Sequence, residues 1–116
     1  MDHKALMVKL AQGQLDAYNN RDIETFCRFF HPEVEVFRIG STDRICVGME
    51  AFREIYRKRF NDNPRLHCEL RSRTVLGFSV LDEEWVTGVE GAEAPSHVVA
   101  IYQIEDGLIK YVSFCR

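Results

Sequence analysis

Alternation of apolar and polar residues through most of the second half of the chain constrains the fold more than any other feature. Four segments have this pattern, which is typical of half-buried strands: residues 66–76, 80–89, 97–105 and 108–115. Asp106 and Gly107 separate the last two segments, and this dipeptide predicts a tight hairpin turn. We therefore expect a series of antiparallel strands in this half.

Helices are expected in the first half instead. Three segments place apolar residues at helical spacing: 4–18, 23–30 and 49–61. Asp22 is typical of a residue that begins a helix, and Pro32 is expected to end the second one. Two short strand patterns, 33–39 and 44–47, precede the third helix. This order predicts an α+β fold in which a curved antiparallel sheet wraps around helices.

Length and charge bound the function. The 116 residues suit one domain, spanning 1–116, and the net charge of −3 argues against binding nucleic acid. No apolar run approaches the roughly 18 residues that a membrane span needs, and no signal peptide opens the chain. The four cysteines (27, 46, 68 and 115) form no Cys-x-x-Cys pair and are interpreted as small buried hydrophobic residues. We predict a cytoplasmic protein with neither a nucleic-acid nor a membrane partner.

Four motifs occur in an order and spacing that cover nearly the whole chain: 18–24, 29–36, 48–53 and 104–109. With them the sequence resembles the nuclear transport factor 2-like superfamily, and within it the SnoaL-like and ketosteroid-isomerase-like domains. The resemblance implies a cystatin-like cone, in which a bent antiparallel sheet surrounds three helices of the N-terminal half. It also implies a pocket at the wide end and, in many members, a homodimer formed through the outer sheet face.

The resemblance also allows the catalytic positions of ketosteroid-isomerase-like enzymes to be compared with the residues of this chain. The positions that carry the general base and the two oxyanion-holding groups of ketosteroid-isomerase-like enzymes correspond here to Arg38, Gln14 and Ala100. Only Tyr56 matches, at the place of a supporting tyrosine of the third helix. Enolisation by that machinery is not expected, because nothing at the base position accepts a proton.

Charged residues on two predicted strands suggest a different site. If Val34 and Val36 face inward, Arg38 does too, and its guanidinium needs a partner there. Asp82 and Glu84 share a face with apolar neighbours and are also expected inside, with Arg38 as their counter-ion. We predict Asp82, Glu84 and Arg38 as catalytic candidates beside a small hydrophobic or anionic ligand. Alternatively, these charges lie solvated at the rim or form a structural ion pair.

The expected pocket lining is polar and aromatic. The predicted ligand-binding residues are Gln14, Tyr18, Phe30, Tyr56, Ala100, Tyr102 and Phe114. Ordinary core packing is the alternative for the aromatic residues, and Tyr18 and Tyr56 are favoured because a buried hydroxyl requires a partner. No pair of histidines has metal-ligand spacing, so we predict neither a metal site nor a cofactor.

The opposite face of the sheet is expected to be apolar. The residues assigned to it are Phe37, Ile39, Val75, Trp85, Val99, Ile101 and Tyr111, interspersed with Glu35, Arg71 and Arg73. No predicted helix remains to cover this face, so a partner is expected on it. An identical copy is the simplest one, and we predict a homodimer.

Two classes of function remain open. One is a SnoaL-like isomerase, cyclase or hydrolase that uses Asp82 or Glu84 as base and Arg38 as electrostatic stabiliser. The other is a non-catalytic binding or protein-interaction module on the same scaffold, because one fold hosts many functions. The sequence names no substrate for either.

Overall fold

The computed structural model describes residues 2–115 and has the predicted α+β architecture. The elements are α1 (His3–Asn19), α2 (Ile23–Cys27), β1 (Phe30–Arg38), β2 (Arg44–Val47), α3 (Met49–Asp62), β3 (His67–Leu76), β4 (Ser79–Thr87), β5 (Ser96–Glu105) and β6 (Leu108–Cys115). No helix within these residues is long and apolar enough to cross a membrane.

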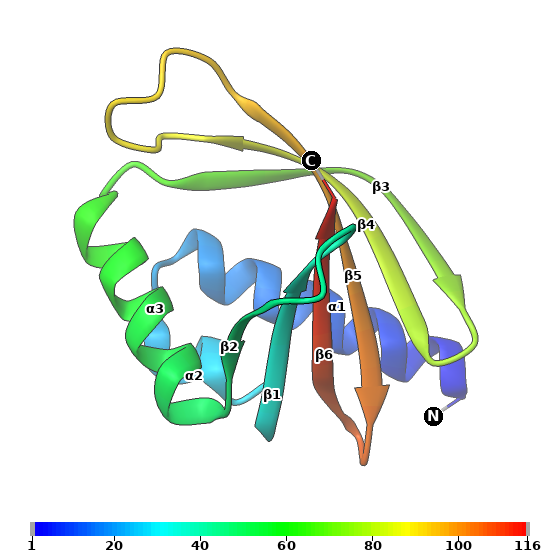
Figure 1. Ribbon diagram of the computed structural model, residues 1–116. Coiled ribbons are helices and arrows are strands. Elements are labelled where there is room, and N and C mark those ends of the chain that lie inside the picture. The colour runs from blue at the N-terminus through cyan, green and yellow to red at the C-terminus, as the bar shows by residue number, and fades with distance from the viewer. Residues whose placement is uncertain (1, 116) are drawn as a thin grey trace.

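One curved sheet of six strands, in the order β2-β1-β6-β5-β4-β3, surrounds the three helices (Figure 1). Neighbouring strands run antiparallel except β1 and β6, which are parallel. α1 packs against β3 and β4, α3 packs against β1 and β2, and α2 contacts both of the longer helices. The helices therefore leave part of the concave side of the sheet uncovered, in the space between α1 and α3.

The second helix is shorter than predicted. Asp22 begins α2 as expected, because its side chain accepts a hydrogen bond from the Thr25 backbone N–H at 3.2 Å. The helix ends at Cys27, however, and Phe30 already belongs to β1. Pro32 lies inside that strand, where the pairing of β1 with β6 shifts register. Proline has no N–H to donate to a neighbouring strand, so it fits such an interruption.

The predicted turn between β5 and β6 is present. Asp106 and Gly107 have φ values of 56° and 76°. A two-residue hairpin loop of the favoured type requires positive φ at both positions, which Gly and Asp tolerate better than other residues. This turn fixes the pairing of the two strands that form the centre of the cone wall.

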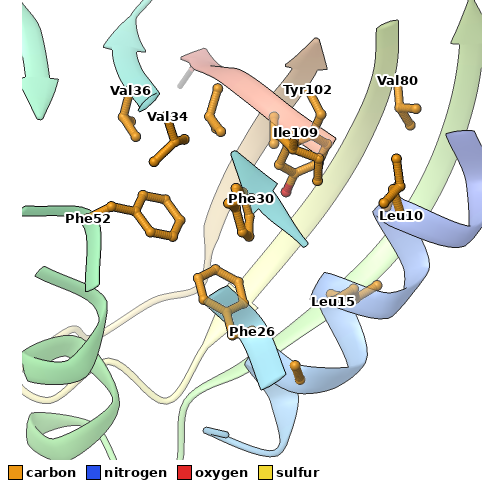
Figure 2. Close-up of a cluster of buried hydrophobic side chains, with 14 of the residues drawn as sticks. Leu10, Leu15, Phe26, Phe30, Val34, Val36, Phe52, Val80, Tyr102 and Ile109 are labelled. Atoms are coloured by element: carbon orange, nitrogen blue, oxygen red, sulfur yellow. The ribbon is translucent and has the colours of Figure 1, made fainter. Parts of the chain in front are cut away.

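An aromatic cluster joins the helices to the sheet. Phe26 of α2 packs against Phe30 of β1, with ring centroids 4.9 Å apart, and Phe30 packs against Phe52 of α3 at 4.5 Å. All three side chains are buried and turn toward one another, as Figure 2 shows. Contacts of this kind stabilise a core beyond the area that they bury. The cluster holds α2 and α3 in place around the site.

A bulge in β3 changes which residues of that strand point inward. Leu70 pairs with Glu84 and Ser72 with Glu83, so Arg71 is an extra residue in β3. Beyond the bulge, Arg73 and Val75 point toward the helices, where Arg73 contacts Gln12 of α1 and Val75 packs on the core. The prediction that Arg73 and Val75 lie on the outer face is therefore wrong.

The rest of the outer face agrees better with the sequence pattern. Phe37, Trp85, Val99, Ile101 and Tyr111 are only partly buried, and no described helix covers them. The Arg71 guanidinium lies over the Trp85 ring, 5.3 Å from its centroid. A mixed apolar and charged surface remains on this side of the sheet.

Candidate functional site

A cavity of about 180 Å³ lies between the helices and the concave side of the sheet. Its lining comprises Gln14, Leu15, Tyr18, Phe26, Phe30, Val36, Ile45, Cys46, Ile55, Tyr56, Arg59, Cys68, Glu84, Val86, Val98, Tyr102, Val112 and Phe114. Ile45 and Ile55 are 46% and 41% exposed, so they border the mouth. The cavity is thus open at one end, mostly apolar, and supplied with a few polar groups.

Glu84 is the carboxylate of this cavity. It lies on β4, where alternate residues are buried, and only 5% of it is exposed. No Lys, Arg or His nitrogen of residues 2–115 lies within 4 Å of its oxygens. Burial, with a smaller effect from Asp82, raises the pKa of Glu84 to about 7, against the lowering effect of Cys68, Arg73 and Tyr102. The group can therefore donate or accept a proton near neutral pH.

Tyr102 and Gln14 form a polar pair beside Glu84. The Gln14 amide donates to the Tyr102 hydroxyl at 3.2 Å and to the Ala11 carbonyl at 3.0 Å. Burial, followed by the nearby Glu84 and Asp82, raises the pKa of Tyr102 well above its ordinary value. The phenol stays protonated, and because Gln14 occupies its oxygen as a donor, its proton is left for an acceptor in the cavity.

Tyr18 and Tyr56 form a second polar group. The Arg59 Nε donates to the Tyr18 hydroxyl at 2.9 Å. The Tyr56 ring packs on Phe52 and Phe26, with centroids 4.7 and 4.9 Å away. Burial raises the pKa of both phenols, and Arg59 partly opposes this rise. Both tyrosines are therefore neutral hydrogen-bonding groups in an aromatic wall.

Asp82 faces inward as predicted but does not line the cavity. Its two carboxylate oxygens accept from Arg73 Nε and Nη2 at 2.7 and 2.9 Å, and the residue is fully buried. Arg73 Nη1 also donates to Gln12 at 3.0 Å. Asp82 is therefore part of a structural ion pair, as in one of the alternatives, but its partner is Arg73 and not the predicted Arg38.

The predicted place of Arg38 inside the cone is wrong. Its side chain is exposed, it is not part of the cavity lining, and no carboxylate in the described part of the chain lies within 4 Å of it. Arg38 is the last residue of β1 and keeps the parity of Val34 and Val36. At the end of the strand, however, the helices no longer cover this face, so the guanidinium stays in water.

Six of the seven residues predicted to bind ligand line the cavity: Gln14, Tyr18, Phe30, Tyr56, Tyr102 and Phe114. Ala100 does not, because it lies opposite Asp82 in the sheet and is fully buried there. The binding roles of all seven stay predictions.

Three lining residues with polar or polarisable side chains were missed by the sequence analysis: Arg59, Cys46 and Cys68. Arg59 follows Tyr56 by three positions, which places both on one face of α3, so helical spacing was an available signal. Cys46 and Cys68 are buried, whereas Cys115 is exposed. Residues 2–115 contain no cluster of three or more His, Cys, Asp or Glu side chains that could hold a metal ion.

A family model described as the SnoaL-like domain matches residues 11–112. The chain belongs to the SnoaL-like domain family. This confirms the resemblance inferred from the four sequence motifs. A comparison with curated protein sequences finds no significant match.

Solved structures place this SnoaL-like domain among proteins of the same fold. It is similar to an uncharacterized cystatin-fold protein from Novosphingobium aromaticivorans, with 26% identity, a TM-score of 0.86, and coverage of 95% of this chain and 97% of that one. It is also similar to a candidate polyketide cyclase from Sinorhizobium meliloti (20%, 0.79, 92% and 94%). A third similar structure is an LEH-like epoxide hydrolase from M. tuberculosis (16%, 0.78, 95% and 81%). The last two likenesses concern the fold alone.

Proposed function

We propose that this SnoaL-like domain is an acid–base enzyme of the isomerase or cyclase type, which moves a proton at a carbon next to a carbonyl group. The observation that carries the proposal is Glu84, a nearly buried carboxyl with no ion-pair partner, in an apolar cavity and with a pKa of about 7. Catalytic bases work best when their pKa lies near the working pH. Asp82 has no part in this proposal, because Arg73 occupies both of its oxygens.

The proposed reaction begins with Glu84 ionised. Its carboxylate takes a proton from the acidic carbon, and the two electrons of the C–H bond move toward the carbonyl oxygen to give an enolate. Return of the proton from Glu84 at another carbon gives an isomer. For ring closure, the enolate carbon attacks the carbon of a second carbonyl group in the substrate, the π electrons of that C=O bond move to its oxygen, and the oxygen takes the proton from Glu84. The protonated Tyr102, whose oxygen already accepts from Gln14, is a suitable donor to the developing negative charge.

The size of the cavity limits the substrate. Its 180 Å³ is close to the roughly 150 Å³ of an apolar cavity that holds benzene. A substrate with about one ring fits inside, and a longer one extends past Ile45 and Ile55 into solvent. We therefore expect small, mostly apolar carbonyl compounds.

Hydrogen–deuterium exchange tests the proposed chemistry without a known substrate. One-ring ketones such as cyclohexanone and 2-cyclohexenone are incubated with the protein in D₂O, and loss of the signals of the protons next to the carbonyl is followed by NMR. The intact protein should accelerate exchange, and Glu84→Gln should remove most of the acceleration. Compounds that bind, by thermal shift, without any enzyme-dependent exchange would favour the alternative of a non-catalytic binding module.

We also propose that two copies associate through the outer sheet face. Support comes from the partly exposed Phe37, Trp85, Val99, Ile101 and Tyr111, which no described helix covers. Light scattering after size exclusion should give twice the mass of one chain. Ile101→Lys should lower that mass toward one chain, whereas Thr42→Lys, in the exposed β1–β2 turn, should leave it unchanged. A single-chain mass for the unaltered protein would contradict the proposal.

A further inference from the structure

The polar groups of the cavity differ in charge. Glu84 is close to half protonated at pH 7, and the three tyrosines are neutral. Arg59 is the cation of the lining, and a guanidinium stays charged at any ordinary pH. Near neutral pH, where Glu84 is partly protonated, the cavity therefore has a positive charge at Arg59 that the lining itself does not fully balance.

Arg59 has no counter-ion in the described chain. No carboxylate of residues 2–115 lies within 4 Å of its guanidinium. The other basic residues near the end of α3 differ in this respect, because Arg57 pairs with Glu54 and Lys58 with Asp62. A partly buried charge without a partner is costly to desolvate further, unless a ligand supplies the opposite charge.

The donors of Arg59 are only partly used. A guanidinium has five N–H groups, and the Nε–H of Arg59 donates to Tyr18. This hydrogen bond holds the planar group against the aromatic wall and leaves the edge formed by Nη1 and Nη2 without a side-chain or backbone acceptor among residues 2–115. Two parallel N–H groups on one edge match the two oxygens of a carboxylate.

The position of Arg59 in the cavity fits such a role. Its side chain is only partly buried, whereas Glu84 is almost completely buried, so the two charges occupy sites of different depth. The same lining contains apolar and aromatic side chains such as Phe26, Phe30 and Val98. One molecule can therefore bind with its anionic end at Arg59 and its apolar body toward Glu84.

We infer that the ligand of this cavity is a small organic acid, whose carboxylate binds the Nη1–Nη2 edge of Arg59 while its apolar body fills the aromatic pocket. The inference deepens the proposed function by naming the substrate class, and it rests on that function only for what happens at the Glu84 end. Arg59 is assigned here as the specificity-determining residue and Tyr18 as the residue that positions it. The ligand is expected to bind better below pH 7 than above it, since protonation of Glu84 removes a negative charge from the cavity.

Calorimetric titration with matched acids and amides tests the inference. Benzoate, phenylacetate and cyclohexanecarboxylate are each compared with the corresponding primary amide, which has nearly the same shape but no charge, at pH 6. At least one acid should bind about tenfold or more tightly than its amide, because hydrogen bonds to a charged group are the stronger kind. Amides that bind as tightly as the acids, or a failure of every acid to bind in the millimolar range, would overturn the inference.

Variants locate the effect. Arg59→Gln should reduce the preference for acid over amide to less than about twofold, and Arg59→Lys should retain part of it because the charge remains. The matched control is Arg57→Gln on the exposed side of the same helix, which should keep the full preference. Circular dichroism and thermal melting establish that each variant is folded before titration. An unchanged preference in folded Arg59→Gln would contradict the assignment.

Glu84→Gln separates this inference from the proposed function. That variant should retain the preference for acids, because Arg59 is intact, while losing the exchange of carbon-bound protons. If the unaltered protein does not accelerate exchange of ketone protons in D₂O, the proposed function fails, and the preference for acids over amides in the titration still decides the inference about Arg59. Conversely, exchange of ketone protons without any preference for acids would refute only the inference about Arg59.

Discussion

Asp82 and Glu84 lie two residues apart on β4, point to the same side of the sheet and are both buried, yet their surroundings differ completely. Asp82 accepts two hydrogen bonds from Arg73 and lies outside the cavity. Glu84 has no ion-pair partner and lines the cavity, and its pKa rises to about 7. The charge of Asp82 is therefore balanced by Arg73, whereas Glu84 has no cation beside it and changes its protonation near pH 7.

The strand that pairs with β4 accounts for the difference. Arg73 lies opposite Asp82 in the β3–β4 pair, whereas Leu70 lies opposite Glu84. If β3 paired without the bulge, Arg71 would lie opposite Glu83, and Ser72 would take the place of Arg73 opposite Asp82. The bulge therefore supplies a cation to one carboxylate and leaves the other facing an apolar side chain. Two carboxylates that are buried to a similar extent thus differ in role, because the neighbouring strand β3 places an arginine opposite one and a leucine opposite the other.

The largest effect is expected from removing the cation. Arg73→Met leaves Asp82 buried without a partner and should lower the free energy of unfolding by about 3–5 kcal/mol, measured by urea denaturation at pH 7. The double variant Arg73→Met with Asp82→Leu should recover most of this loss, because the buried charge is gone as well. A loss below about 1 kcal/mol in the single variant would show that the pair is not structural.

Glu84 is expected to have a smaller effect on the free energy of unfolding, which depends on pH and has the opposite sign: its buried charge destabilises the folded protein. Its carboxyl has a pKa near 4.5 in the unfolded chain and about 7 in the folded one, so the folded protein binds more protons between these values. The free energy of unfolding should therefore fall as pH rises from about 4.5 to 7, by up to about 3 kcal/mol.

Glu84→Gln should lack that fall. The variant is expected to be more stable than the unaltered protein at pH 8 and to lose this advantage at pH 4.5, as measured by denaturation at the two pH values. A difference between the two proteins that stays constant with pH would mean that Glu84 has an ordinary pKa, which would remove the electrostatic contrast with Asp82.

The smallest effect concerns the polar neighbour of Glu84. Because Tyr102 acts to lower the pKa of Glu84, Tyr102→Phe should raise that pKa further, as followed by carbon NMR titration of the carboxyl group. Loss of the hydroxyl, which also accepts from Gln14, should reduce the free energy of unfolding by about 1 kcal/mol. An unchanged titration would indicate that Tyr102 acts on Gln14 alone.

The sequence predicted the inward faces well where a strand alternates without interruption. Asp82 and Glu84 were placed inside from their parity on β4, and most of the aromatic lining followed from helical and strand spacing. Arg73 was placed outside because uninterrupted alternation was assumed along β3. The bulge at Arg71 reverses the parity of the residues beyond it, and nothing in residues 70–73 of the sequence marks the position of the bulge. A single inserted residue thus changed the assigned partner of a buried carboxylate.

Two further errors have a different cause. Arg38 has the inward parity that the sequence indicated, but parity does not reveal where the helices stop covering the strand. Arg59 was not assigned to the site, although it follows Tyr56 by three positions on the same face of α3. Helical spacing shows that Arg59 shares a face of α3 with Tyr56, but how far that face extends into the cavity depends on how α3 packs against the sheet.

The parallel pairing of β1 with β6 has a consequence for synthesis on the ribosome. β6 lies between β1 and β5 and contributes Val112 and Phe114 to the cavity wall. Until that strand emerges, no strand joins the two halves of the sheet, β2-β1 and β5-β4-β3, by hydrogen bonds, and the edges at β1 and β5 remain open to other chains. A nascent chain that lacks β6 should consequently be prone to aggregate, and a ligand added during translation should begin to protect the chain only after the final strand has left the exit tunnel.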